Sequence, residues 1–241
     1  MPYRRLPKTD AARLRALKTV LDSNEIYTAR NRFISWDTIN RAQPAYDRLL
    51  TAAEQYRMSY SAQLRSAGKA DRLQRNAAMY VSHFLQVLMM GVERGEIKRQ
   101  ALTLYGLDQD ATALPPFKGA AGLIRLGRQA AEGEKARVKA GGRPIYNPTI
   151  GMVSTHLDIF EECYTQQKRL QERTAAALDA LKQIRPEVDA VLLDLWNQIE
   201  ARFKDEPVEE RLDHCRRLGV VYYYRKNEKK KMEQQAVKVA E

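Results

Sequence analysis

Residues 188–203 have the sequence VDAVLLDLWNQIEARF, and this stretch decides the fold class. Its large apolar side chains recur at the three- and four-residue spacing of one helix face: Val188, Val191, Leu192, Leu195, Trp196, Ile199 and Phe203. Acidic and amide residues occupy many of the positions between them, so the other face is polar. The stretch therefore predicts an amphipathic helix that packs against other helices.

The same spacing continues through most of the chain and predicts further helices. Four of the predicted helices are long and one is shorter: about 36–66, 69–94, 148–184, 186–205 and 119–140. Ser35 is the expected N-cap of the first, and Pro44 predicts either a kink inside it or a later start of the helix. We therefore expect an all-α protein, an antiparallel helical bundle of about four long helices with shorter peripheral helices.

Signals for helix ends and for strands refine this prediction. Residues 147–148, Asn-Pro, are the expected N-cap and first position of the third long helix, and Pro186 is expected to break or sharply bend it. Gly219 is expected to end a short helix that begins near Pro207. Residues 220–224 have strand composition, but one short run without a partner does not make a sheet.

Length and composition fit one large domain or two small ones. The chain has 241 residues, 44% hydrophobic and 29% charged, and its longest apolar run is too short to span a bilayer. Cys163 and Cys215 cannot build a disulfide framework, and no signal peptide is visible. We expect a cytoplasmic protein with a basic N-terminal helical segment, a helical bundle containing a linker, and a basic tail: 1–34, 35–219 with the linker near 106–118, and 220–241.

Positive charge is concentrated at the two ends of the chain. The formal net charge is +11, and residues 1–32 hold eight Lys or Arg against three Asp or Glu. Residues 211–241 hold nine against four, whereas the remaining 178 residues hold 24 against 23. Arg accounts for 26 of the 41 cations, and its guanidinium suits bidentate contacts with phosphate or carboxylate groups. The ends therefore either bind an anionic partner or only keep the chain in solution.

The candidate binding residues are the cations of these ends and the three tyrosines among them. The predicted nucleic-acid-binding set is Arg4, Arg5, Lys8, Arg13, Arg216, Arg217, Tyr222, Tyr223, Tyr224, Arg225, Lys226, Lys229, Lys230 and Lys231. Cations interleaved with tyrosines can hold phosphates and stack bases. The tyrosines could equally pack on the bundle and leave the lysines in water.

Catalytic and metal-binding patterns are not found in the sequence. A di-iron bundle needs Glu-x-x-His pairs, but the residue three before each histidine is Tyr80, Val153 or Arg211. Residues 122–127 have the glycine spacing of a phosphate-binding loop, yet Arg-Gln follows where Lys-Ser or Lys-Thr is required. We therefore expect a non-enzymatic protein, without metal or cofactor, that binds an anionic macromolecule: nucleic acid or an acidic protein surface.

An alternative function depends on apolar side chains instead. Met89, Met90 and Tyr60 could contact another protein or a second copy of the chain, which would make it a scaffold or a homo-oligomeric structural protein. A large exposed apolar patch would favour this alternative. A continuous positive face that joins both termini would favour nucleic acid.

Five short motifs are spread along the chain. They are Tyr105-Gly-Leu-Asp108, Gly133-Glu134, Gly141-Gly142 followed by Asn147-Pro148, Trp196, and Gly219-Val-Val-Tyr222. Together they resemble features of a family of uncharacterised all-helical bacterial proteins, although Leu218 stands where members tend to carry Trp. The resemblance implies a bacterial helical protein with no assigned activity, and it adds no function to the prediction.

Overall fold

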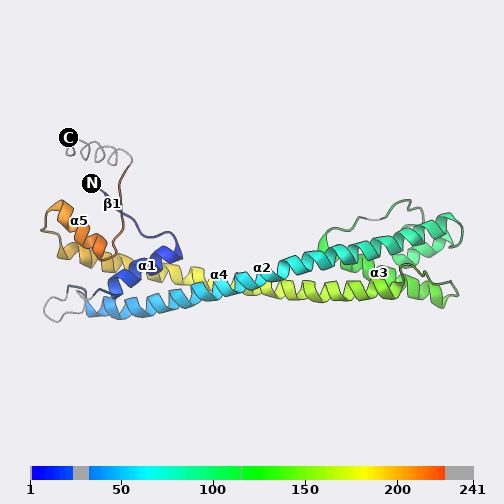
Figure 1. The fold of residues 1–241 in the computed structure, drawn as a ribbon, viewed down its shortest axis with the longest axis horizontal. Helices are drawn as coiled ribbons and strands as arrows, with labels where there is room; N and C mark the ends of the chain where they lie inside the picture. The colour runs from blue at the N-terminus through cyan, green and yellow to red at the C-terminus, as the bar shows by residue number, and fades with distance from the viewer. Residues whose placement is uncertain (1, 24–32, 115, 226–241) are drawn as a thin grey trace. The chain divides into compact units, whose positions relative to one another are not determined.

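A computed structural model describes residues 2–23, 33–114 and 116–225. The predicted all-α class is confirmed, because helices make up nearly all of the regular structure in these residues (Figure 1). The helices are α1 (Asp10–Leu21), α2 (Trp36–Glu93), the 3₁₀ helix η2 (Arg99–Tyr105), α3 (Gly119–Lys139), α4 (Ile150–Arg202) and α5 (Val208–Arg217). The strands are β1 (Tyr3–Arg4) and β2 (Tyr222–Tyr223).

The chain divides into two compact units. Unit 1 comprises Met1–Met58 and Ala175–Glu241, and unit 2 comprises Ser59–Thr174, so α2 and α4 each contribute to both. The two basic ends belong to unit 1 by this division. The expected linker near 106–118 lies within unit 2, where its described residues form loops and turns.

Among the described residues, α2 and α4 take the place of the four long helices that the sequence predicts. The expected boundary between 36–66 and 69–94 is absent because α2 runs through it, and α4 likewise continues through the expected break at Pro186. Gly68, at the first of these boundaries, costs a helix only about 1 kcal/mol relative to Ala. The helix prediction is therefore correct and its subdivision is wrong.

Both internal prolines lie on the exposed side of their helices. A proline cannot donate to the carbonyl four residues earlier, which leaves the carbonyls of Asn40 and Lys182 without that partner. Pro44, Pro186 and these two residues are all exposed, so water can reach the freed carbonyls. The remaining cost, up to about 3 kcal/mol for each proline, is of the size that burial of one or two large apolar side chains offsets.

In unit 1, the first part of α2 runs antiparallel to the last part of α4. Arg41 pairs with Asp194 at 2.7 Å and Arg48 pairs with Glu187, so later residues of α2 meet earlier residues of α4. The apolar face predicted at 188–203 is buried in the core of this unit, together with residues from α1, α2 and the end of α5.

Asp194 helps to fix the start of α2. Ser35 is the N-cap, as predicted, because its Oγ accepts a hydrogen bond from the Thr38 backbone N–H at 3.3 Å. The Asp194 carboxylate accepts hydrogen bonds from the Thr38 hydroxyl (2.7 Å), the Arg41 guanidinium (2.7 Å) and the Gln198 amide (3.2 Å). These interactions, the Thr38 hydrogen bond above all, hold the pKa of Asp194 below its usual value.

The lowered pKa of Asp194 predicts how stability changes in acid. A carboxyl whose pKa is depressed by folding stabilises the fold above its unfolded-state pKa, about 3.9 for Asp, and this contribution is lost as the pH falls through the folded-state pKa. Asp194→Asn should therefore unfold at lower urea than the unsubstituted chain at pH 7, and the difference should narrow progressively as the pH falls below about 3.9. Asp71→Asn, at an exposed position of α2, is the control. A difference that stays constant or grows in acid would contradict this account of Asp194.

In unit 2, α2 and α4 are again antiparallel. The ring of Tyr80 stacks on His156, with centroids 3.9 Å apart, and the Gln167 amide donates a hydrogen bond to the Gln63 carbonyl at 3.4 Å. Gly127 of α3 packs closely against both long helices, since a Cβ at this position would lie 2.7 Å from a methyl of Leu157 and 3.2 Å from one of Val81. The absence of a side chain there is what permits this approach.

A buried cluster of Tyr105, Glu134 and Arg137 joins η2 to α3. The Glu134 carboxylate accepts hydrogen bonds from the Tyr105 hydroxyl (2.5 Å), the Arg137 guanidinium (2.9 Å) and the Ile145 backbone N–H (2.8 Å). Arg137 also donates to the Arg143 carbonyl at 2.8 Å. Burial and the hydrogen bond to Glu134 raise the pKa of Tyr105, so its hydroxyl remains a donor. The cluster thereby ties three separate segments of unit 2 together.

The start of α4 differs from the prediction. Thr149 caps this helix in place of Asn147, because its Oγ1 accepts a hydrogen bond from the Met152 backbone N–H at 3.2 Å. The peptide bond between Asn147 and Pro148 is cis. Asn and Thr are both good N-cap residues, and Thr149 is the one directly before the first helical residue, Ile150.

Candidate functional site

The strands β1 and β2 join the two ends of the chain within unit 1. They pair antiparallel, with Tyr3 opposite Tyr223 and Arg4 opposite Tyr222, and the Arg5 backbone N–H donates to a carbonyl of residue 221 at 3.3 Å. The expectation that residues 220–224 have no partner strand is therefore wrong. The partner strand is only two residues long and lies at the opposite end of the sequence. Two residues are too few to show the alternation that would predict a strand.

A glycine turn leads from α5 into β2 and lies against α1. Gly219 ends the helix, as predicted: its φ is +83°, its N–H donates to the Arg216 carbonyl at 2.9 Å, and the Val220 N–H donates to the Cys215 carbonyl at 3.0 Å. A Cβ at Gly219 would lie 3.0 Å from the carbonyl oxygen of Ala16. Glycine thus allows both the left-handed backbone and the close approach to α1.

A groove of about 460 Å³ lies between α1 and this turn. Its cationic lining residues come from both ends of the chain and are Arg5, Lys8, Arg15 and Arg216; Tyr223 lines it as well. The other described residues that line it are apolar or carry a hydroxyl, and none is Asp or Glu. We call this feature the basic groove.

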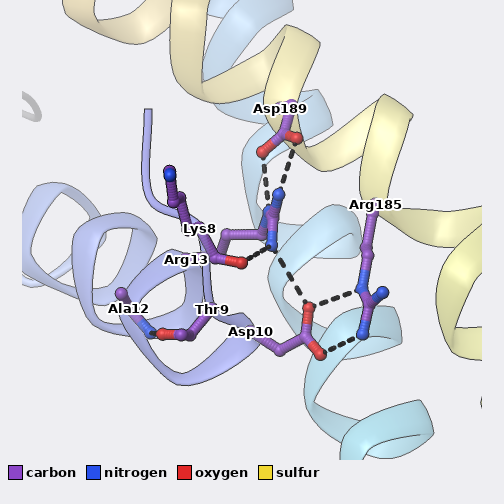
Figure 2. A network of polar contacts seen from close by, with 7 residues as sticks. All are labelled: Lys8, Thr9, Asp10, Ala12, Arg13, Arg185 and Asp189. Atoms are coloured by element: carbon purple, nitrogen blue, oxygen red, sulfur yellow. Dashed lines mark hydrogen bonds and ion pairs between the residues drawn. The ribbon is translucent and has the colours of Figure 1, made fainter. Parts of the chain in front are cut away.

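Three of the four cations in the basic groove have no counter-charge among the described residues. Arg5, Lys8 and Arg15 are exposed, and their side chains form no ion pair with a described acidic residue. The side chain of Lys8 extends away from the neighbouring ion pairs (Figure 2). Arg216 differs, because it pairs with Asp213 at 2.9 Å and donates to the Tyr224 hydroxyl at 2.7 Å.

Arg13, one of the predicted binding residues, is buried and forms ion pairs within unit 1. It is only 8% exposed, and its guanidinium makes two hydrogen bonds to Asp189 (2.7 and 2.9 Å) and a longer one to Asp10 (3.4 Å). Asp10 in turn accepts two hydrogen bonds from Arg185 (2.7 and 2.8 Å), so alternating charges connect α1 to α4 (Figure 2). The hydrogen bonds to Asp189 raise the pKa of Arg13. We therefore leave Arg13 out of the candidate site.

Arg4 and Tyr222 bond to residues of α4 and do not line the basic groove. The Arg4 guanidinium donates to Glu200 (2.9 Å) and Asn197 (2.7 Å), and the Tyr222 hydroxyl donates to Glu200 at 2.6 Å. Burial and the hydrogen bond to Glu200 raise the pKa of Tyr222. Burial also raises the pKa of the neighbouring thiol, Cys215, which is free and buried. Arg4 and Tyr222 thereby anchor the strand pair to α4.

The remaining predicted residues have different environments. Arg217 and Arg225 are exposed but do not line the basic groove, and Tyr224 is half-buried. Lys226, Lys229, Lys230 and Lys231 lie outside the described residues.

Arg15 was missed by the sequence interpretation. The signal that could have found it is the helical spacing of Ala12, Arg15 and Thr19, which places it on the same face of α1 as two other residues of the groove.

The apolar residues of the alternative hypothesis lie in unit 2. Tyr60 is 44% exposed and Met90 is 43% exposed, whereas Met89 is half-buried and packs against the core. Among the described helices, none is both long and apolar enough to cross a bilayer. Within the same residues, no three His, Cys, Asp or Glu side chains are placed to hold a metal ion.

Comparison with known proteins identifies no relative. No protein-family model matches the chain, and searches of curated proteins and of solved structures found no significant match. The resemblance to a helical bacterial family therefore stays a prediction.

Proposed function

We propose that the protein is a non-enzymatic binding protein whose basic groove holds an anionic macromolecule, and that this partner is a nucleic acid. The observation that carries the proposal is the meeting of cations from both chain ends around one groove with no acidic lining residue among those described. Arg5, Lys8 and Arg15 are the central residues, because they are exposed and no described acidic side chain neutralises them.

The chemistry of the groove suits phosphate. Guanidinium and ammonium groups donate several hydrogen bonds, accept no hydrogen bonds and carry a positive charge at neutral pH. These properties favour anion binding over proton transfer. Each phosphate that meets such a cation releases condensed counterions, so affinity comes mainly from the salt-dependent term and carries little sequence preference. Strong dependence on salt is accordingly the signature of this function.

A triple variant tests this proposal. Arg5, Lys8 and Arg15 are replaced together by Ala, which removes three charges that support no described ion pair. We expect the slope of log K against log salt for a labelled oligonucleotide to flatten by about 2–3, and the affinity at about 0.1 M salt to fall roughly 100-fold. Fluorescence anisotropy over a salt series measures both quantities.

A matched control removes the same charge elsewhere. Arg65, Lys69 and Arg72 are exposed residues of α2 in unit 2, and replacing them by Ala should leave the slope nearly unchanged. Equal losses in the two triple variants would mean that overall charge, and not the groove, determines binding. If the unsubstituted chain binds neither DNA nor RNA at about 50 mM salt, the proposal is wrong and the scaffold hypothesis takes its place.

A further inference from the structure

The strand pair β1–β2 has two faces with different surroundings. Directly opposed residues of paired strands lie on the same face, and successive residues alternate between faces. Arg4 and Tyr222 share the face that contacts Glu200 and is thereby occupied. Tyr3 and Tyr223 share the other face, where their rings lie 6.2 Å apart and the residues are 43% and 45% exposed.

This exposed tyrosine pair borders the basic groove. Tyr223 lines the groove together with Arg5, which follows Tyr3 by two residues and whose backbone N–H continues the pairing of the two chain ends. Aromatic rings beside a track of cations are what single-strand binding proteins use, because bases stack on the rings while phosphates meet the cations. A duplex offers the phosphates but keeps its base faces inside the helical stack.

We infer that the basic groove selects single-stranded nucleic acid, a conclusion that rests on the proposed function. Arg5, Lys8 and Arg15 hold the phosphates of the strand, and unpaired bases stack on Tyr223 and Tyr3. Tyr222 does not stack on bases, since its hydroxyl donates to Glu200 and the residue packs against the core of unit 1. Stacking is tolerant of sequence because every base has an aromatic face, so the selection is for unpaired strands and not for a motif.

The test compares two probes and four tyrosine variants. The probes are a labelled oligothymidine of about 15 nucleotides, near the upper site size of a single-strand binding fold, and a duplex of equal length. Tyr223→Ala should weaken binding of the oligothymidine by roughly 5- to 150-fold, Tyr3→Ala should weaken it in the same direction, and Tyr223→Phe, which keeps the ring, should stay within about 2-fold. Tyr146→Ala, which removes a 76% exposed tyrosine of unit 2, is the control and should change nothing.

The outcomes separate this inference from the proposed function. Duplex affinity should be lower than single-strand affinity and should hardly respond to Tyr223→Ala. If the chain binds both probes equally, or if Tyr223→Ala weakens both alike, nucleic-acid binding stands and single-strand selection is wrong. If it binds neither probe but binds polyglutamate, the partner is an acidic protein surface and both conclusions fail. Circular dichroism and tryptophan fluorescence of each variant must match those of the unsubstituted chain, and Tyr223→Phe gives a result even if Tyr223→Ala does not fold.

Discussion

Replacing Glu134 by Ala should lower the free energy of unfolding by about 3–5 kcal/mol. Glu134 is 1% exposed, and its carboxylate accepts hydrogen bonds from Tyr105, Arg137 and the Ile145 backbone. Removing it leaves the guanidinium of Arg137 buried without a counter-charge and two further donors without an acceptor. Urea unfolding followed by far-UV circular dichroism measures the loss, and hydrogen exchange should show weaker protection of residues 99–145.

The surface of α3 supplies the control for Glu134. Glu132 and Lys135 form a 3.5 Å ion pair whose side chains are 75% and 76% exposed, and Glu132→Ala should cost less than about 1 kcal/mol. Glu134→Gln keeps the shape of the side chain and one acceptor oxygen, but it loses the charge and turns the other oxygen into an NH2 donor. Its loss of stability should therefore fall between those of Glu132→Ala and Glu134→Ala. A loss for Glu134→Ala no larger than that for Glu132→Ala would contradict the structural role of the buried cluster.

Trp196→Ala should destabilise the chain by about 3–5 kcal/mol, the usual cost of deleting a large buried aromatic side chain. Trp196 is fully buried in the core of unit 1. Its indole N–H has no hydrogen-bond acceptor among the described residues, so Trp196→Phe removes an unsatisfied donor along with some volume. We expect the Phe variant to lose less than about half as much as the Ala variant.

Leu193 lies on the exposed side of the same helix and provides the comparison for Trp196. It is 42% exposed, and Leu193→Ala should stay within about 0.5 kcal/mol of the unsubstituted chain. Urea unfolding followed by circular dichroism suits all three variants, since it does not depend on the tryptophan that two of them lack. Equal effects of Trp196→Ala and Leu193→Ala would mean that the helix face is assigned incorrectly.

The sequence predicts the helices well because burial imposes a period on them. All seven residues of the apolar face predicted within 188–203 are in the core of unit 1, as the spacing predicts. The same patterns cannot say where a helix continues through a proline. That depends on whether water can reach the freed carbonyl, as the exposure of residues Asn40 and Lys182 allows, and therefore on tertiary structure.

The candidate site could be predicted only in part. Net charge identifies the basic ends, but the role of each cation depends on distant partners: Arg13 is paired with Asp189, 176 positions away, while Arg5 has no described acidic partner. Sequence also cannot separate Tyr222 from Tyr223, since their opposite roles follow from alternation along a strand whose partner is at the other end of the chain. The burial of Glu134 was missed because it depends on how η2 packs on α3.

Photo-crosslinking tests the central claim most directly, namely that the two chain ends form one nucleic-acid site. The unsubstituted chain is irradiated with an oligonucleotide that carries a photoreactive thymine analogue, and the crosslinked peptides are identified by mass spectrometry. We predict crosslinks in both residues 3–19 and residues 216–225 from the same probe, with Tyr223 foremost, and their loss when Arg5, Lys8 and Arg15 are replaced by Ala. Crosslinks confined to one end, or concentrated at residues 65–75 of α2, would contradict the claim.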